Sequence, residues 1–195
     1  MCESTVWAFC PVLVCSFFLF LSKINILRGE EMKVSVIMGS MSDFPKVEQA
    51  VIILKKFGIE VDIQCLSAHR CSDELSQYMQ RINNDGTEVV IAAAGMAAAL
   101  PGVVAAQTIL PVIGVPIKGA SLDGVDALLS IVQMPSGIPV ATVAIDGVKN
   151  AAYLAIQILS IKYKELEEKV KQERLDMKNA ILKANQELQN KYKGE

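Results

Sequence analysis

Short apolar runs alternate with segments of helical periodicity between Met32 and about Ser160. The apolar runs are mostly continuous rather than alternating, which is typical of strands buried on both faces of a sheet. In the segments between them, apolar residues recur at the spacing of one helix face. The pattern predicts strands at Lys33–Met38, Val61–Leu66, Val89–Ala94, Val112–Val115 and Val140–Ile145, and helices around Val47–Phe57, Ser72–Ile82, Leu100–Gln107, Gly124–Met134 and Asn150–Ser160.

Five successive strand–helix units predict an α/β fold with a doubly wound parallel sheet and right-handed crossovers. The 29 residues between Glu88 and Lys118 carry no charge. Prolines interrupt this stretch at Pro101, Pro111 and Pro116, so it indicates protein core rather than a membrane helix.

The first 31 residues form an apolar leader, uncharged from Ser4 to Ser22. Its length is at the lower limit for a membrane span, and it lacks the preceding positive charge of a secretory signal. If it inserted, Lys23 and Arg28 would keep the rest of the chain in the cytoplasm. We expect instead that residues 1–31 are a non-native extension from an over-extended start, with the native chain opening at Met32.

The C-terminal segment, residues 161–195, carries nine basic and seven acidic residues. A narrow apolar stripe on an otherwise polar helix follows Leu166, Val170, Met177, Ile181 and Leu188. Such a stripe either covers a neighbouring subunit or packs back on its own domain. The chain therefore divides into a leader (1–31), an α/β catalytic domain (32–160) and a charged C-terminal helix (161–195) that we expect to be inter-subunit.

Composition excludes several classes of protein. The 195 residues are 52% hydrophobic, and 19 basic against 21 acidic side chains give a net charge of −2. Disorder is disfavoured, and the basic excess of a nucleic-acid binder is missing. The chain has one histidine, so a multi-histidine metal centre cannot form within it. Five cysteines without ligand spacing indicate a reducing compartment.

Ligands of open parallel sheets bind where the strands end, so the loops after the first three strands are the candidates. The first loop holds Ser40, Ser42 and Asp43 before a helix. Its glycine, hydroxyls and free amides suit a phosphate, while Asp43 suits sugar hydroxyls. Ser and Asp at a helix start are also ordinary caps, and the loop alone favours that interpretation.

The second loop reads Ser67-Ala68-His69-Arg70. A lone histidine is usually a hydrogen-bonded structural residue. At a strand end, beside an arginine that can grip phosphate with two N–H groups, His69 is better interpreted as the acid–base group of a site.

The third loop, Ala92 to Gly102, consists mainly of very small side chains. Such residues allow close helix packing, and at a strand end they also let a planar ring lie against the backbone. The glycines match neither the dinucleotide fingerprint nor the Walker loop.

Five motifs follow one another in this chain: GSMSD, SAHR, AGMAAALPGVVAA, PVIGVP and LDGVDALLSIVQMPSGIPVATVAIDGVKNAA. In this order they resemble the 5-(carboxyamino)imidazole ribonucleotide mutase family of purine biosynthesis. The resemblance implies a flavodoxin-like three-layer sandwich, a homo-octamer in the cytoplasm and no metal or organic cofactor. It also implies transfer of a carboxyl group from the exocyclic nitrogen of the substrate to ring carbon C4, by release and recapture of carbon dioxide.

The resemblance implies roles for single residues. His69 is expected to be the general acid and base, and the 5′-phosphate is expected at Ser42, Ser67 and Arg70. Ser40 and Asp43 line the same loop, with Asp43 reaching the ribose. The remaining expected substrate-binding residues form the small-residue wall: Gly95, Met96, Ala98, Ala99 and Leu100.

One position departs from the family pattern. Many bacterial members have a second histidine where this chain has Ala99. Either His69 suffices, which the continuing alanine run favours, or the enzyme is weaker or altered.

Two other functions remain open. The first is direct carboxylation of aminoimidazole ribonucleotide with free carbon dioxide. Animal-type and some bacterial members with this activity carry lysine at the position of Arg70, so the arginine argues against that reaction. A non-catalytic flavodoxin-like binding module is the second, but Phe44 is the only aromatic residue that the strand-end loops offer a flavin.

Overall fold

The computed structural model describes residues 31–193. The leader expected at residues 1–31 lies outside them, apart from Glu31. Among the helices of this described region, none is long and apolar enough to cross a membrane.

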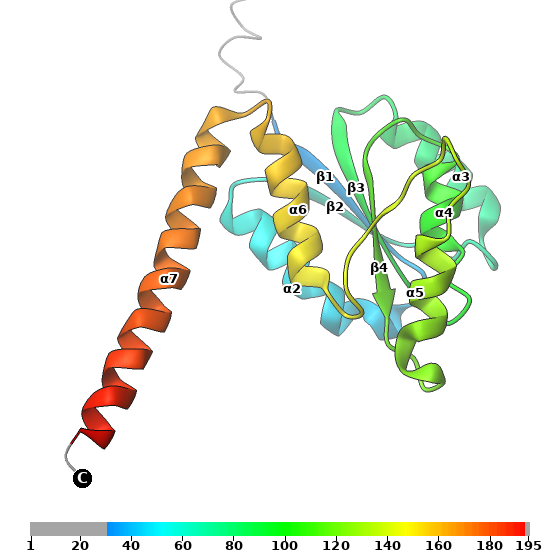
Figure 1. Ribbon diagram of the computed structural model, residues 1–195. Coiled ribbons are helices and arrows are strands. Elements are labelled where there is room, and N and C mark those ends of the chain that lie inside the picture. Colours follow the sequence, from blue (N-terminus) through cyan, green and yellow to red (C-terminus); the bar gives the residue numbers. More distant parts are fainter. Residues whose placement is uncertain (1–30, 194–195) are drawn as a thin grey trace, which may run out of the picture. The chain divides into compact units, whose positions relative to one another are not determined.

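One parallel sheet forms the centre of the domain, with the strand order β2-β1-β3-β4-β5 (Figure 1). The order reverses between β1 and β3, which are paired side by side and so make the switch point of a doubly wound sheet. The predicted α/β fold class is therefore confirmed. The strands are β1 Lys33–Met38, β2 Glu60–Cys65, β3 Thr87–Gly95, β4 Val112–Ile117 and β5 Ala141–Thr142.

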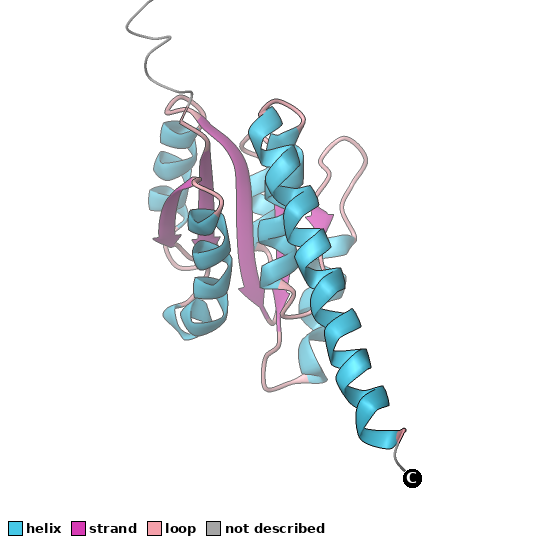
Figure 2. Ribbon diagram, turned by 90° about the vertical axis from the view of Figure 1, so that its left-hand side faces the viewer, coloured by secondary structure: helices cyan, strands magenta, loops and turns pink. Residues whose placement is uncertain are grey.

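Helices cover both faces of the sheet and give the three layers seen in Figure 2. One face packs against α2 (Phe44–Lys56), α6 (Val148–Ser160) and the start of α7 (Lys164–Tyr192). The other packs against α3 (Ser72–Ile82), α4 (Leu100–Ala105) and α5 (Val125–Val132).

Local chemistry explains several helix boundaries. Pro45 stands in the first turn of α2, where its missing N–H costs no hydrogen bond, and Gly58 follows that helix at a φ of +83°. In α3, Asp73 and Glu74 occupy the first turn and Arg81 the last, which complements the helix dipole.

Both edge strands differ from the prediction. β2 is half-exposed rather than buried on both faces, because Val61 and Ile63 pack against the core while the polar Asp62 and Gln64 alternate with them. β5 is limited to Ala141–Thr142 instead of Val140–Ile145. The chain beyond it stays beside β4, since Val143 N donates to Gly114 O at 3.1 Å and Asp146 N donates to Pro116 O at 2.8 Å.

The C-terminal stripe is divided in two. Leu166 is fully buried in the core and Val170 packs against it. Farther along α7, Met177, Ile181 and Leu188 are 47%, 71% and 57% exposed. Among residues 31–193, the stripe thus packs back on the domain only over its first turns.

Candidate active site

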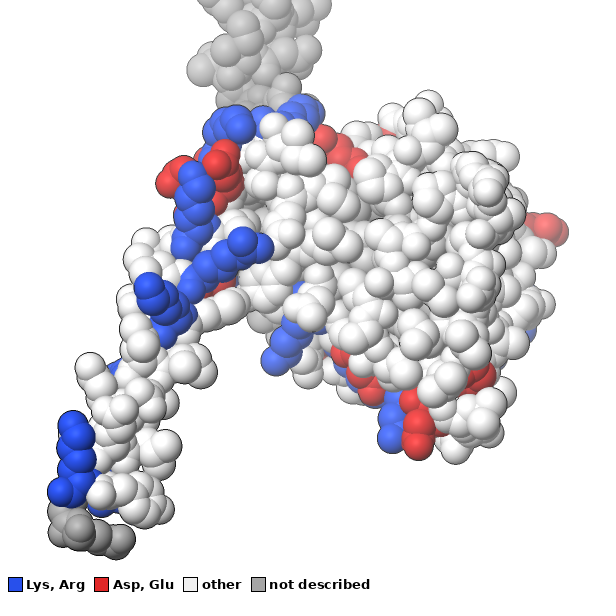
Figure 3. Space-filling view, in the orientation of Figure 1, with Lys and Arg blue, Asp and Glu red and all other residues white. Residues whose placement is uncertain are grey.

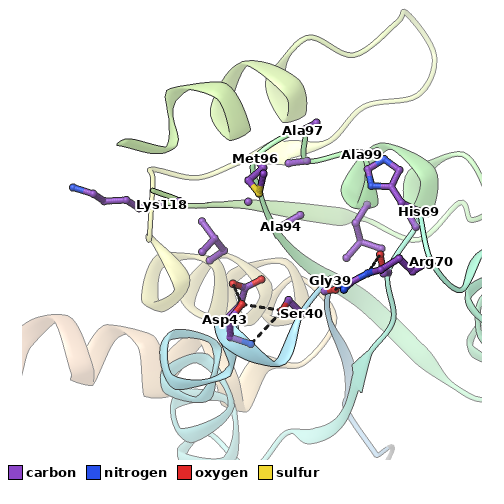
Figure 4. A pocket seen from close by; sticks show the side chains of 18 of the residues that line it. Gly39, Ser40, Asp43, His69, Arg70, Ala94, Met96, Ala97, Ala99 and Lys118 are labelled. Atoms are coloured by element: carbon purple, nitrogen blue, oxygen red, sulfur yellow. Dashed lines mark hydrogen bonds between the residues drawn. The ribbon is translucent and has the colours of Figure 1, made fainter. Parts of the chain in front are cut away.

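The carboxyl ends of the central strands enclose a cavity of about 740 Å³. Its wall combines the loops after β1, β2, β3 and β4 (Figure 4). The structure brings together every residue proposed from the sequence: Ser40, Ser42, Asp43, Ser67, His69, Arg70, Gly95, Met96, Ala98, Ala99 and Leu100.

In the loop after β1, the serines form a small hydrogen-bonded turn. Ser40 Oγ accepts from the backbone N of Ser42 at 3.3 Å, and so caps the short helix η1 (Met41–Asp43). The Ser42 hydroxyl lies 2.8 Å from Ser40 Oγ and 3.3 Å from Asp43 Oδ1. Asp43 makes no capping hydrogen bond to α2. The capping interpretation is thus correct for Ser40, whereas the Asp43 carboxylate faces the cavity.

The loop after β2 is held by its own backbone. Arg70 N and Cys71 N both donate to Ser67 O, at 3.3 and 3.0 Å, and Ser67 N donates to Cys71 Sγ at 2.9 Å. This tight turn places His69 and Arg70 at its exposed tip. Within residues 31–193, the His69 imidazole makes no hydrogen bond or ion pair. A structural role through hydrogen bonding is therefore not supported.

The Arg70 guanidinium is oriented by two contacts. Its Nε donates to Ser67 Oγ at 3.3 Å and its Nη2 to Gly39 O at 2.9 Å. No other described residue accepts a hydrogen bond from Nη1, so both of its hydrogens can bind a ligand. The arrangement suits an anion bound between the first two loops.

The loop after β3 supplies the apolar part of the wall. Met96 turns the chain at a φ of +56°, a left-handed conformation uncommon for a residue with a side chain. The small side chains that flank it leave room above the strand ends. A Cβ on Gly95 would lie 3.1 Å from Ile117 O, so glycine permits β3 and β4 to approach closely here.

The structure adds cavity residues that the sequence did not single out. Lys46, one turn along α2 from Asp43, lines the cavity, as do Ile117, Lys118 and Gly119 at the end of β4. In Figure 4, Lys118 lies at the opposite end of the cavity from His69 and Arg70. The rule that ligands bind at strand ends could have directed attention to the loop after β4, since β4 is the neighbour of β3.

Burial is the main influence on the Asp43 carboxyl and raises its pKa. The hydrogen bond from Ser42 and the positive charge of Lys46 oppose this effect, whereas the charge of Asp146 adds to it. The ionisation of Asp43 thus depends on a balance among its neighbours.

The chain is similar to known proteins over most of the described region. The family model for AIR carboxylase matches residues 33–180. The N5-carboxyaminoimidazole ribonucleotide mutase of Pyrococcus horikoshii is 53% identical over 155 residues, which cover 80% of this chain and 88% of that protein. The protein of the same name from Saccharolobus solfataricus is 57% identical over 150 residues, or 77% and 95% of the two chains.

A solved structure agrees with these matches. The crystal structure of Treponema denticola PurE aligns with a TM-score of 0.75 and 33% identity, covering 81% of this chain and 99% of that one. The residues matched by the family model include the strand-end loops that form the cavity. The chain belongs to the AIR carboxylase family.

Proposed function

We propose that this chain is an N5-carboxyaminoimidazole ribonucleotide mutase and that the strand-end cavity is its active site. It isomerises 5-(carboxyamino)imidazole ribonucleotide to 4-carboxy-5-aminoimidazole ribonucleotide in purine biosynthesis. The observation that carries the proposal is the exposed His69 imidazole, which has no hydrogen-bond partner among residues 31–193, in the same cavity wall as the anchored Arg70 guanidinium. The relatives that bear the mutase name, at 53% and 57% identity, support the assignment.

The 5′-phosphate binds between the first two loops. Arg70 offers its Nη1 hydrogens, while the hydroxyls of Ser42 and Ser67 lie in the same wall. Charge-assisted hydrogen bonds to phosphate are stronger than neutral ones, so this end of the cavity supplies most of the affinity. The Asp43 carboxylate accepts hydrogen bonds from the ribose hydroxyls.

His69 moves the proton. As the bond between the exocyclic nitrogen and the carboxyl carbon breaks, carbon dioxide leaves and the imidazolium protonates that nitrogen. The C4 carbon of the electron-rich ring then attacks carbon dioxide, and the neutral imidazole removes the proton from C4. One proton is given and one is recovered, so the isomerisation needs no other reactant.

The apolar wall retains the carbon dioxide. Met96, Ala98, Ala99 and Leu100 surround the reacting end of the ring without offering it a charged group. Retention beside C4 makes the recapture effectively unimolecular, and exclusion of water prevents hydration of the gas. The family histidine absent at Ala99 is dispensable in this mechanism.

A substrate assay tests the proposal. The purified chain is supplied with 5-(carboxyamino)imidazole ribonucleotide, without ATP or added bicarbonate, and formation of the C4-carboxylated product is measured. Conversion is expected. Product formed only from aminoimidazole ribonucleotide and bicarbonate would indicate the direct carboxylase instead, while inactivity with retention of FMN would indicate a flavodoxin-like binding module.

For the assembly, we propose a homo-octamer in the cytoplasm. Two exposed apolar surfaces of the described residues support self-association. One is the distal stripe of α7, and the other combines Leu122, just before α5, with Val125, Leu129 and Val132 of α5, each at least 46% exposed. Figure 3 shows basic side chains gathered along α7, while the surface over α4 and α5 carries few charges. The free thiols of Cys65 and Cys71 fit a reducing compartment.

A further inference from the structure

Lys46 is a cation in the cavity wall that has no part in the chemistry above. It lies one helical turn after Asp43, the residue that precedes α2, so the two side chains lie on the same side at the start of this helix. Its Nζ lies 2.8 Å from both carboxylate oxygens of Asp146 and 3.4 Å from the backbone O of Lys118. The ammonium group is therefore held in place rather than left to move in solvent.

Asp146 links this cation to two further segments. Its Oδ1 also accepts from Lys118 N at 2.9 Å, and its own backbone N donates to Pro116 O at 2.8 Å. The residue adopts a φ of +56°, a conformation that these bonds help to maintain. The start of α2, the end of β4 and the turn before α6 thus meet at one ion pair beside the cavity.

We propose that Lys46 is a positioning residue that keeps a fixed positive charge beside Asp43, so that Asp43 binds the ribose hydroxyls of the substrate as an anion. Asp146 holds Lys46 in place, and its own negative charge limits the effect of Lys46 on the ionisation of Asp43. The inference rests on the proposed function for the identity of the ligand, but the electrostatic coupling itself does not depend on that function.

The charged groups around Asp43 act in opposite directions. Burial raises the pKa of Asp43 most, the Ser42 hydrogen bond and Lys46 lower it, and Asp146 raises it. The cavity wall also holds the side chains of His69 and Arg70, and Lys118 is paired with Asp123 at 2.8 Å. Cys65, at the end of β2, is a further titratable group that interacts electrostatically with Asp43. Lys46 is the positive group among them that lies one helical turn from Asp43 and is held by Asp146.

The test compares two substitutions that must act in opposite directions. Lys46→Met removes the cation, and the pKa of Asp43 is expected to rise. Asp146→Asn removes an anion while its amide oxygen can still accept from Lys118 N, and the pKa of Asp43 is expected to fall. Lys46→Arg keeps the charge and should resemble the parent. Lys55→Met removes a charge from an exposed position at the far end of α2 and serves as the matched control.

Two measurements are made on the full chain. Carbon NMR of the Asp43 carboxyl gives its pKa directly, without ligand. The pH profile of kcat/KM gives its effect on substrate binding: the acidic limb should move to higher pH in Lys46→Met and to lower pH in Asp146→Asn. At neutral pH, Lys46→Met is expected to raise KM about twofold to fivefold, the range for a partly exposed charge pair, with little change in kcat.

The outcomes separate this inference from the proposed function. If both substitutions move the pKa of Asp43 in the same direction, or neither moves it, Lys46 has a merely structural role and the inference is overturned. If the parent chain has no mutase activity, the proposed function fails, and the NMR titration alone still decides whether Lys46 sets the ionisation of Asp43.

Discussion

Arg70 Nη2 donates a hydrogen bond to Gly39 O at 2.9 Å and thereby joins two loops that are 31 residues apart in the chain. These loops follow β2 and β1, which are neighbours in the sheet. The bond limits the rotation of the guanidinium and directs it along the cavity wall. A phosphate group entering between the loops meets a donor that is already in position.

Arg70→Ala should weaken binding of the ribonucleotide more than it slows the reaction. Loss of a charge-assisted phosphate contact costs about 1.5–3 kcal/mol of binding free energy. Calorimetric titration with the C4-carboxylated product measures this directly, with Lys55→Ala as the control for loss of one exposed charge. An unchanged dissociation constant would contradict the phosphate assignment.

His69→Asn should abolish most turnover and leave binding largely intact. Asparagine is similar in size and polar, but it cannot donate and recover a proton near neutral pH. A loss of at least about 100-fold in kcat is expected, in line with general acid–base catalysis. The measurement is kcat at saturating substrate together with the dissociation constant of the product. Turnover at the parent rate would remove His69 from the mechanism.

Ala99→His adds the second histidine that the family resemblance leads us to expect at this position. In the proposed mechanism His69 both donates and accepts the proton, so an imidazole added to the cavity wall at Ala99 should change kcat by far less than the roughly 100-fold that a positioned acid–base group contributes. The assay is the same conversion without ATP or bicarbonate. A large gain in kcat would show that this chain lacks a catalytic group.

Removal of the exposed part of α7 tests the assembly. A cut after Ser160 would also delete the buried Tyr163 and Leu166, so a cut after Arg174 is preferable. It retains Glu173, which bonds to Lys56 at 2.7 Å and to Tyr153 at 3.0 Å. If the distal stripe covers a neighbouring subunit, the particle mass measured by light scattering should fall.

A point substitution gives the same test without shortening the chain. Ile181→Glu places a charge on the stripe, whereas Asn179→Glu places one on the opposite side of the helix. Only the first should reduce the particle mass. Equal masses for both variants and for the parent would show that the distal part of α7 makes no subunit contact.

Gly114 in the middle of β4 should not tolerate a side chain. A Cβ there would lie 2.5 Å from Ile131 Cγ2 and 2.7 Å from Val140 Cγ1. Gly114→Ala is therefore expected to lower the free energy of unfolding by about 1–3 kcal/mol, as overpacking does. Urea denaturation measures the loss. Ala141→Val, on the exposed edge strand, is the control and should have a small effect.

Hydrophobic periodicity determined the α/β class and the approximate position of every strand and helix, because burial against a central sheet imposes a local pattern on the chain. It identified α3 at Ser72–Ile82 and β1 at Lys33–Met38 without error. It overestimated the length of β5, because the extent of strand pairing depends on the neighbouring strand β4. Val140 packs over Gly114 of β4 instead of extending the paired segment.

The strand-end rule and the motifs also identified the candidate site residues from the sequence, since each lies next to a strand whose direction the topology sets. Only the tertiary structure decided the contacts between segments that are distant in the sequence. Lys46 and Asp146 are 100 residues apart, and nothing local in either segment indicates the other. The division of the α7 stripe after Val170 is equally non-local. An apolar residue in a helix has the same periodicity whether the domain covers it, as it covers Leu166, or ends before reaching it, as at Ile181.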